Sequence, residues 1–586
     1  MLTLRPSSRG ITGSRWKPDK DKGRKKTKGR FSWLCSRFSL TLGLGLLSIF
    51  NAIPAWGAER IAFLYPPFGE FYISVEDLEI FAKEGRITPE FAFYARRATP
   101  EQLAQLRDLL QQRFEVSPIT VYQFTRSPIG ETVLRRLGLV LKADFNRNGF
   151  YPLRAALRQA AADSEGLTVI NTLRQFPLKT IRLDLQLSLD AVREISRLLE
   201  QRDLVIATIQ QQAASEAATA ESVGVLGELD LRLPGVIRWR KETLTFTNPN
   251  RTAPVPFDIY LPTPLHPSSG REGTGELTPL IVISHGVASD RNTFAYLAQH
   301  LASHGFAVAV LEHPDTSAEK FERFLAGFDT PPDPTTFVNR PLDVKYLLDE
   351  LAATSESELA WPGRLNLQEV GVIGQSLGGY TVLALGGAQL NIEQLREQCR
   401  QAEANNLTFN LSLLLQCRAT DLPSATYNFQ DERVKAVIAV NPLSSAIFGQ
   451  QGLSSIQVPL MLVAGSDDVF TPPVPEQFYP FTGLTTPDKY LVLAQNGTHF
   501  SFLSGKNKGA LPVPPELIGP DPTLARRQLT ALSTAFFKTH IANQPEFRPY
   551  LSESYIKSIS QDPFNLTLVR FLTETQLEQA RRVGTN

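Results

Sequence analysis

The 586-residue sequence predicts a protein of the α/β class, in which a mostly parallel, doubly wound sheet follows a mainly helical N-terminal domain. Three observations predict this fold. Short, continuously apolar segments recur after about residue 226, helical segments separate most of them, and the chain before them carries mainly helix signals. A composition of 42% hydrophobic and 20% charged residues is that of a globular protein, and the length predicts several domains.

Residues 1–57 have the pattern of an export signal peptide. A basic segment is followed by an uncharged apolar stretch from Phe38 to Ile53, and the small residues Ala55 and Gly57 precede Ala58. This order predicts cleavage before Ala58 and a mature protein in the periplasm, a lumen or the medium. The alternative is an uncleaved membrane anchor, although a stretch of 16 residues is short against the ~20 that a bilayer requires.

The charge of the chain is divided unevenly. Residues 1–37 hold twelve Lys and Arg against two Asp and Glu, a net of +10, whereas the whole chain carries +1. The remaining residues therefore carry −9. A chain segment with this negative net charge repels the phosphate backbone, and we therefore expect no nucleic-acid partner.

Residues 58–215 are predicted to form a helical domain of unknown function. Ser74 is an N-cap before an acidic first turn, Thr99-Pro100-Glu101 begins a second helix, and a long helix runs from Leu187 to about Gln212. The run rich in Ala, Ser, Glu and Thr that follows predicts a linker at residues 216–225. Because titratable residues form no cluster here, this N-terminal region is a candidate for membrane or envelope association and not for catalysis.

Residues 226–545 are predicted to form the α/β domain. Glu242–Thr247 and Val255–Leu261 read as an antiparallel pair at the sheet edge. The predicted buried parallel strands are Leu280–Ile283, Phe306–Leu311, Val370–Ile373, Val434–Val440, Leu460–Val463 and Tyr490–Leu493. The predicted helices between and after them include Asn292–Ser303, Pro341–Ala352, Leu377–Leu385 and Thr523–Ala542, and residues 546–586 are left as a C-terminal tail.

The sequence Gly374-Gln375-Ser376-Leu377-Gly378 matches the Gly-x-Ser-x-Gly turn that presents a nucleophilic serine. It follows a predicted strand and opens a predicted helix, which is the context that this turn requires. Side chains at Gly374 and Gly378 would collide with the packed strand and helix. Ser376 is therefore the candidate nucleophile.

A serine hydroxyl requires a base, and the base in turn requires an acid that orients it. His499 follows the last predicted parallel strand, and Gly465-Ser466-Asp467-Asp468 follows the strand before it. We predict His499 as the base and Asp468 as the acid, with Asp467 as the alternative. The chain order Ser, Asp, His is that of the α/β-hydrolase fold.

The other histidines are predicted to lie outside the catalytic site. His300 and His304 are four residues apart on a helix, but no carboxylate completes a metal site. His266, His313 and His540 are predicted to be structural or exposed. We expect no metal and no organic cofactor.

The oxyanion of an acyl-transfer intermediate requires preset N–H donors. We expect one donor at Leu377, directly after the nucleophile, and the other at Val287 in Ser284-His285-Gly286-Val287, with His285 shaping this loop. The alternative for this loop is an ordinary His-Gly turn.

Two cysteines remain in the predicted mature chain. Cys399 and Cys417 are 18 residues apart and form a disulfide or stay as two buried thiols. Both lie in an insertion at residues 389–432. Its apolar stretch Leu407–Leu415 is a candidate lid or acyl-pocket lining, or else a core helix, and Phe321–Thr336 is a candidate cleft rim.

These motifs resemble those of the predicted dienelactone-hydrolase group of bacterial α/β hydrolases, which is related to platelet-activating-factor acetylhydrolases. The resemblance is carried by Ser284–Ala298, Asn339–Val344, Gly374–Tyr380 and Gly497–Ser501, and the N-terminal segment resembles an uncharacterised domain that is often fused to such hydrolases. The resemblance implies hydrolysis of carboxylic esters without a cofactor. Dienelactone hydrolases proper use a cysteine nucleophile, so Ser376 argues against lactone cleavage.

The sequence thus predicts an exported serine hydrolase that acts on lipid-like or small acyl esters. An acyltransferase or a peptidase with the same triad is the first alternative. A scaffold for an envelope partner, with a hydrolase-fold domain attached, is the second.

Overall fold

The computed structural model describes residues 57–219, 229–263, 277–355, 365–404, 409–504 and 515–583. Apart from Gly57, the predicted export signal lies outside these residues, and so does His266. The predicted linker at 216–225 lies outside them from residue 220 onwards, and its first residues belong to the helix α9, Leu185–Thr219. Within the described ranges, no helix is long and apolar enough to cross a membrane.

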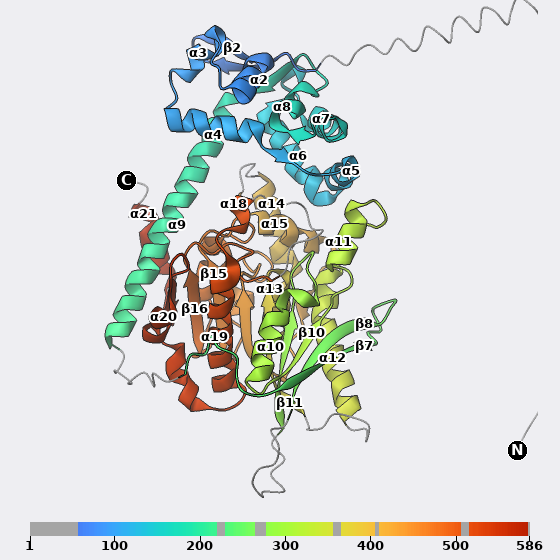
Figure 1. Ribbon diagram of the computed structural model, residues 1–586, viewed down its shortest axis with the longest axis vertical. Coiled ribbons are helices and arrows are strands. Elements are labelled where there is room, and N and C mark those ends of the chain that lie inside the picture. The colour runs from blue at the N-terminus through green and yellow to red at the C-terminus, as the bar shows by residue number, and fades with distance from the viewer. Residues whose placement is uncertain are drawn as a thin grey trace, which may run out of the picture. The chain divides into compact units, whose positions relative to one another are not determined.

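A nine-stranded, mostly parallel sheet forms the larger part of the structure (Figure 1), as the sequence predicts. Its strand order is β17-β16-β15-β14-β11-β9-β10-β8-β7, and the six strands from β16 to β10 are mutually parallel. The bounds are β7 Trp239–Phe246, β8 Val255–Pro262, β9 Thr278–Ser284, β10 Ala307–Leu311, β11 Leu365–Gln375, β14 Val434–Val440, β15 Leu460–Gly465, β16 Lys489–Ala494 and β17 Leu566–Val569.

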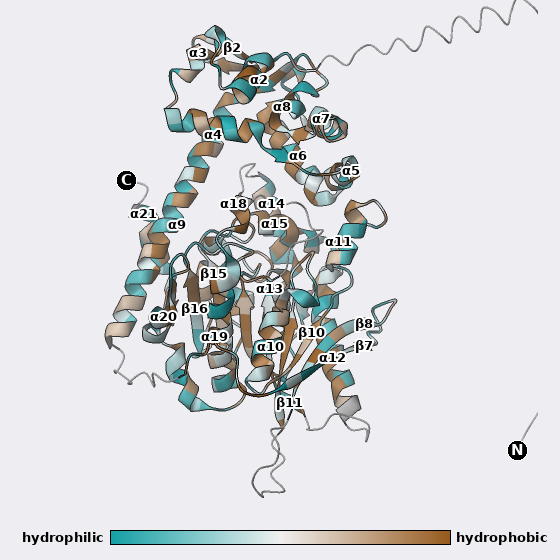
Figure 2. Ribbon diagram, viewed as in Figure 1, coloured by the Kyte–Doolittle hydropathy of each residue, from teal (hydrophilic) through white to brown (hydrophobic). Residues whose placement is uncertain are grey.

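Helices cover both faces of this sheet because successive strand residues point to opposite sides. Val282 of β9 packs into an apolar cluster with Leu347 and Leu383, whereas its neighbour Ile283 packs into a separate cluster with Leu297. The apolar strands appear brown in Figure 2. The helices of this domain are α10 Ala295–Ser303, α11 Ala318–Leu325, α12 Thr336–Ser355, α13 Leu377–Leu385, α16 Gly449–Leu453, α17 Tyr479–Thr482, α18 Pro515–Ile518 and α19 Pro522–His540, with the short helical turns η2 Arg291–Phe294 and η4 Val474–Phe478.

Antiparallel strands close both edges of the sheet. β7 and β8 form the predicted antiparallel pair at one edge. At the other edge, β17 pairs with β16 and comes from the region that the sequence left as a tail. The helical elements η5 Pro545–Leu551, α20 Glu553–Ile559 and α21 Glu574–Val583 flank β17, so residues 546–583 are an integral part of the sheet domain and not an appendage.

Residues 57–184 combine helices with a small four-stranded sheet that the sequence did not predict. The sheet has the order β2-β1-β6-β4, with β1 Arg60–Tyr65, β2 Gly69–Ser74, β4 Leu141–Lys142 and β6 Thr180–Leu183, and β3 Arg113–Phe114 pairs with β5 Leu167–Thr168. The helices are α2 Val75–Glu84, α3 Pro89–Ala95, α4 Pro100–Gln111, α5 Pro118–Arg126, α6 Pro128–Val140, α7 Phe150–Ala162 and α8 Val169–Arg174, with a 3-10 turn η1 at Asp144–Asn146. The predicted caps are confirmed, because Ser74 and Thr99 accept hydrogen bonds from the first turns of α2 and α4.

The long predicted helix is confirmed as α9, and it continues beyond the predicted end at Gln212. Val205, Ile209 and Ala213 are buried in the apolar cluster of the large sheet. Residues 216–219, predicted as the start of a linker, are thus helical. Ala213 just before them is buried and Glu216 accepts hydrogen bonds from the backbone N–H groups of Arg570 and Phe571, so tertiary contacts override a composition typical of linkers.

Candidate active site

Ser376 lies on a sharp turn between β11 and α13. Its backbone has φ 57° and ψ −120°, a conformation that non-glycine residues rarely adopt, and its side chain is 8% exposed. Such a backbone persists only where the surrounding structure enforces it, and it occurs mostly at functional sites. The turn places the serine at the carboxyl edge of the sheet, with its hydroxyl at the start of a helix.

The two glycines of the motif are required by the close approach of neighbouring backbone. A Cβ atom on Gly374 would lie 2.1 Å from the carbonyl oxygen of Gly378. A Cβ atom on Gly378 would lie 2.0 Å from the carbonyl oxygen of Ser284, at the end of β9. As the sequence predicts, a side chain at either position would collide with the packed backbone.

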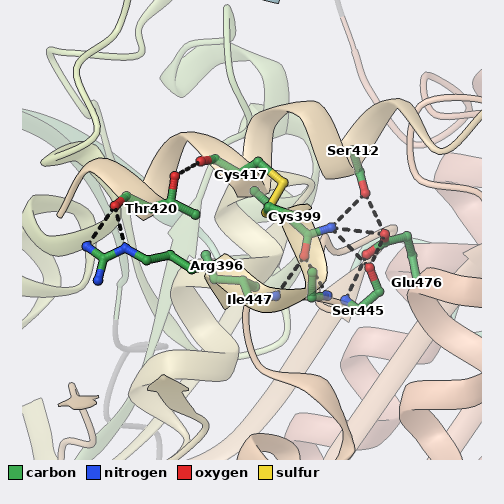
Figure 3. The surroundings of a disulfide bond; sticks show 10 residues. Arg396, Cys399, Ser412, Cys417, Thr420, Ser445, Ile447 and Glu476 are labelled. Atoms are coloured by element: carbon green, nitrogen blue, oxygen red, sulfur yellow. Dashed lines mark hydrogen bonds between the residues drawn. A yellow bond between two sulfur atoms is a disulfide. The ribbon is translucent and has the colours of Figure 1, made fainter. Parts of the chain in front are cut away.

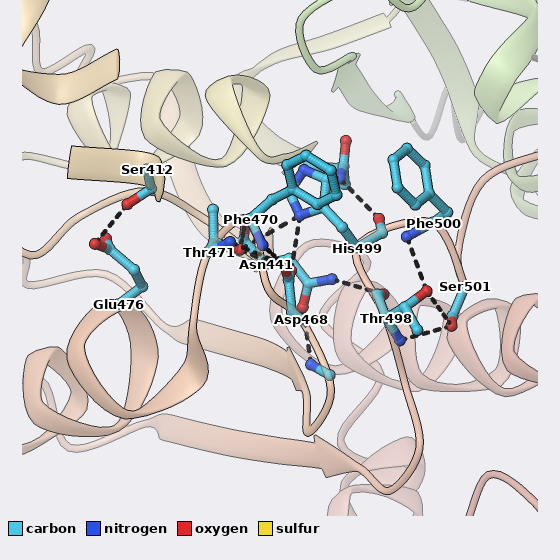
Figure 4. A network of polar contacts seen from close by, with 12 residues as sticks. Ser412, Asn441, Asp468, Phe470, Thr471, Glu476, Thr498, His499, Phe500 and Ser501 are labelled. Carbon is cyan, nitrogen blue, oxygen red and sulfur yellow. Dashed lines mark hydrogen bonds and ion pairs between the residues drawn. The ribbon is translucent and has the colours of Figure 1, made fainter. Parts of the chain in front are cut away.

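The imidazole of His499 contacts the carboxylate of Asp468. Nδ1 of His499 and Oδ2 of Asp468 are 2.7 Å apart (Figure 4). The buried carboxylate also accepts hydrogen bonds from the backbone N–H groups of Phe470 and Thr471, both at 2.8 Å, and from the Thr471 hydroxyl at 2.7 Å. Four donors therefore fix the Asp468 carboxylate where it can orient the imidazole.

The alternative acid, Asp467, faces away from the imidazole. Its Oδ1 accepts a hydrogen bond from Nη1 of Arg202 on α9 at 2.9 Å, and its side chain is 43% exposed. The two adjacent carboxylates thus have separate partners. Only that of Asp468 contacts His499.

Asn441 holds the acid and base loops together, and sequence reasoning missed it. Its Oδ1 accepts from the N–H of Gly465, its Nδ2 donates to the carbonyl of Thr498 at 3.2 Å, and its own carbonyl oxygen lies 3.2 Å from the hydroxyl oxygen of Thr471. Asn441 itself has φ 42°. The available signal was its position, since it directly follows the buried strand Val434–Val440 at the carboxyl edge, where side chains of an α/β sheet converge.

The other imidazole nitrogen of His499 faces the side chain of Gln375. Nε2 of Gln375 lies 3.2 Å from Nε2 of His499 and 3.2 Å from the His499 carbonyl oxygen. Among the described residues, His499 forms no hydrogen bond with the Ser376 hydroxyl. Catalytic hydrogen bonds are often long in ligand-free enzymes and tighten when substrate binds, so proton transfer requires that His499 exchange its contact with Gln375 for one with Ser376.

The loop that contains Val287 packs directly on the nucleophile. A Cβ atom on Gly286 would lie 2.6 Å from Oε1 of Gln375 and 3.2 Å from Cβ of Ser376. Neither the N–H of Val287 nor that of Leu377 donates to another group within the described ranges. Within those ranges, both N–H groups therefore lack an acceptor, and their binding of an oxyanion stays a prediction.

Aromatic side chains flank the imidazole. The ring centroids of Phe470 and Phe500 lie 5.4 Å and 5.7 Å from that of His499, and both rings are partly exposed. Val469 beside them is 42% exposed. This apolar surface suits the alkyl part of an ester better than a charged ligand.

The remaining described histidines lie away from Ser376 and His499 or are inaccessible. His300 is buried on α10 and His304 caps its end, while His540 lies at the end of α19 beside Tyr490. His285 and His313 are both fully buried, so the expectation that His313 is structural holds and the alternative that it is exposed is wrong. In the part of the chain that the structure describes, no three His, Cys, Asp or Glu residues form a group suited to a metal ion.

The insertion at residues 389–432 contains a disulfide between Cys399 and Cys417 (Figure 3). It joins α14, Ile392–Ala404, to η3, Cys417–Asp421, next to α15, Leu411–Gln416. A short strand pair, β12 Gln389–Asn391 with β13 Thr426–Asn428, closes the base of the insertion. Of the apolar stretch proposed as a lid or core helix, residues 407–408 lie outside the described ranges, Leu413 and Leu415 pack on the core, and Leu411 is 43% exposed.

Glu476, in the turn η4, connects this insertion to the sheet edge. Its buried carboxylate accepts hydrogen bonds from Asn410, Ser412 and Gln416 of the insertion. Figures 3 and 4 show the contact with Ser412. It also accepts from the backbone N–H groups of Ser444 and Ser445, which follow β14. This anchor had no local signal in the sequence, because its partners are 31 to 66 residues away.

Two family models match parts of the chain. Residues 57–184 match "Alpha/beta hydrolase of unknown function (DUF1400)", and residues 263–325 match "Platelet-activating factor acetylhydrolase, isoform II". The second match includes β9 and the loop that holds Val287. The first lies before the nine-stranded sheet, in the segment whose sequence resembles an uncharacterised fused domain.

Three curated relatives are each named platelet-activating factor acetylhydrolase. Those of Cavia porcellus and Bos taurus are 51% identical over 45 residues, and that of Canis lupus familiaris is 53% identical over 45 residues. Each match covers 8% of this chain and 10% of the relative, so the chain spans about a tenth of the curated relatives that it matches. The predicted resemblance is confirmed. The chain is hydrolase-like and similar to these acetylhydrolases over a short segment.

Proposed function

We propose that this protein is an exported serine hydrolase that cleaves carboxylic esters through an acyl-enzyme on Ser376. The observation that carries the proposal is the meeting of three segments at one edge of the sheet. Ser376 on its strained turn, His499 held by buried Asp468, and the N–H groups of Val287 and Leu377, which have no acceptor among the described residues, come together there. The names of the relatives support an acyl ester as the substrate, with an acetyl group as the first candidate.

Each group has a distinct role in the proposed reaction. His499 removes the proton from Ser376 as the hydroxyl attacks the ester carbonyl carbon, and Asp468 stabilises the imidazolium that forms. The N–H groups of Val287 and Leu377 bind the carbonyl oxygen as it becomes an oxyanion. His499 then protonates the leaving alcohol, and a water molecule activated by the same imidazole releases the acid.

The proposed location is outside the cytoplasm, with residues 1–57 removed on export. The basic and apolar pattern of that segment supports the proposal, and an uncleaved segment would anchor the enzyme in the membrane. The N-terminal region is proposed to contact a membrane or envelope partner, and no nucleic acid and no cofactor are proposed to take part.

Hydrolysis of p-nitrophenyl esters from acetyl to palmitoyl tests the function. The wild-type protein should turn over at least one ester, and Ser376→Ala should lower kcat by roughly 10⁴-fold or more because the acyl-enzyme cannot form. A serine-directed fluorophosphonate should label the wild type and not the variant. Undiminished turnover by Ser376→Ala would refute the assignment, and Ser454→Ala, at the C-terminal end of α16, is the matched control.

A further inference from the structure

A second Ser–His–Asp arrangement lies beneath the proposed active site. The hydroxyl of Ser284 is 2.9 Å from Nε2 of His313, and Nδ1 of His313 is 2.9 Å from Oδ2 of Asp343. All three side chains are fully buried. A substrate cannot reach this serine, so the arrangement needs another explanation.

The hydrogen bonds assign one direction to each proton in this network. The His313 backbone N–H donates to Nε2 of His285 at 3.0 Å, so Nδ1 of His285 carries the proton and donates to the Gly286 carbonyl at 2.7 Å. Asp343 can only accept, so Nδ1 of His313 also carries a proton and its Nε2 accepts from Ser284. Burial, followed by the charge of Arg340, lowers the pKa of both histidines well below the usual 6.5, so both rings stay neutral.

Arg340 is the centre of the network. It is fully buried, and its guanidinium donates to the carbonyl of His285 and to the hydroxyls of Ser284, Thr316 and Thr381. Burial lowers its pKa to about 9, which still leaves it charged at neutral pH. No lysine could reach these four acceptors at once, because only a guanidinium presents donors in a planar fork.

The charge of Arg340 is compensated nearby. Asp343 accepts two hydrogen bonds from Arg251 and one from Asn248, and Arg251 also pairs with Asp315 at 2.8 Å. Two cations and two carboxylates therefore balance in this buried region. Such a cluster is costly to desolvate, so its ion pairs are weak evidence for a role in stability, and its hydrogen bonds to the loop point to a role in positioning.

The network fixes the loop on which the oxyanion donor lies. The carbonyl group of His285 accepts a hydrogen bond from Arg340, and the carbonyl group of Gly286 accepts one from the His285 ring. In a trans peptide the N–H points opposite to the carbonyl of the same unit, so holding the Gly286 carbonyl sets the direction of the Val287 N–H. The next residue, Ala288, has φ 54°, and its N–H donates to the carbonyl of Thr316, whose hydroxyl binds Arg340.

We propose that Arg340, His313 and His285 form a positioning network that aims the N–H of Val287 at the oxyanion formed on Ser376. This inference rests on the proposed serine-hydrolase function and adds residues that act through Val287 without touching the substrate. Strain at Ala288 is maintained because Arg340 holds both sides of the loop, through the His285 carbonyl and the Thr316 hydroxyl.

Arg340→Lys tests the proposal, with Arg433→Lys as the matched control. Arg433 forms ion pairs with Asp349 and Asp431 just before β14, at the opposite end of the sheet. Arg340→Lys should lower kcat by roughly 100-fold, the usual effect of losing one oxyanion donor, while KM changes less than about threefold. The inhibition constant of a trifluoromethyl ketone, which forms an oxyanion adduct on serine, should rise in parallel.

A purely structural role would give a different result. It would lower Tm and the number of sites labelled by a fluorophosphonate, with kcat per labelled site unchanged, and that outcome would overturn the proposal. If Arg340→Lys does not fold, Thr316→Val removes one acceptor of Arg340 and should lower kcat per labelled site by roughly tenfold; an unchanged value would also overturn it. If the wild type itself shows neither turnover nor labelling, the proposed function fails instead.

Discussion

Asp467 and Asp468 are adjacent and chemically identical, but they differ in burial and in hydrogen-bond partners. Asp468 is buried and accepts four hydrogen bonds, one of them from His499. Asp467 is 43% exposed and pairs with Arg202. The direction in which each side chain leaves the loop decides which carboxylate can stabilise a protonated imidazole.

Asp468→Asn should therefore lower kcat by roughly 10³- to 10⁴-fold with a small change in KM, because an amide cannot stabilise the imidazolium and favours the wrong tautomer. Asp467→Asn, its isosteric neighbour, should stay within about threefold of wild type, since an exposed ion pair contributes little. Steady-state kinetics on one p-nitrophenyl ester compare the two variants. Equal losses in both would argue against Asp468 as the acid.

The insertion at residues 389–432 is held at the carboxyl edge of the sheet by two constraints. The disulfide between Cys399 and Cys417 links α14 to the turn after α15. The carboxylate of Glu476 accepts hydrogen bonds from Asn410, Ser412 and Gln416. The disulfide restricts the conformations of the unfolded chain, whereas the carboxylate satisfies polar groups that would otherwise be buried without partners. Together they give this element one position next to the loop after β14.

Glu476→Gln should release the insertion. The NH₂ group of the glutamine would face the groups that donate hydrogen bonds to Glu476. The loss of these hydrogen bonds should lower the local stability of the insertion by about 3 kcal/mol. Amide hydrogen exchange of residues 409–421 should accelerate, and the preferred acyl length of p-nitrophenyl esters should shift. Glu397→Gln on α14, which alters an exposed pair with Arg400, is the control. Unchanged exchange in Glu476→Gln would contradict the anchoring role.

Buried neutral histidines make the stability of the whole chain depend on pH. Burial lowers the pKa of His300 and of His540 to about 4, and it lowers the pKa of His285 and His313 well below 6.5. The unfolded chain takes up protons near pH 6.5 and the folded chain does not. Their contribution is thus complete above about pH 7 and is lost as the pH falls towards 4.

The free energy of unfolding should therefore fall between pH 7 and pH 5, by up to about 1.4 kcal/mol per pH unit for each such histidine. Urea unfolding at pH 7, 6 and 5 measures this slope. His300→Gln should reduce this slope by up to about 1.4 kcal/mol per pH unit, the contribution of one histidine, because glutamine does not titrate. A stability that is equal at pH 5 and pH 7 in the wild type would contradict the prediction.

Much of the fold is predictable from local sequence. The six parallel strands, the antiparallel pair at one edge and the helix after Ser376 are visible as apolar runs and capping residues, because burial on both faces requires a continuous apolar strand. The small sheet β2-β1-β6-β4 and the edge strand β17 are not visible in this way. β4, β6 and β17 have only two to four residues, and each pairs with a strand that is distant in the sequence. β1 and β2 are longer and form a local hairpin, whose pattern was not recognised as a pair of strands.

The sequence by itself determined the nucleophile turn, the order of Ser376, Asp468 and His499, and the placing of each at the end of a strand. Those features depend on residues next to one another in the chain. Only the tertiary structure decided that Asp468 faces His499, that Gln375 contacts its other nitrogen, and that Asn441 joins the two loops. It also brought Arg340 to the carbonyl of His285, 55 residues away. Contacts of this kind depend on how the strands and helices pack, and no local pattern of residue types encodes that packing.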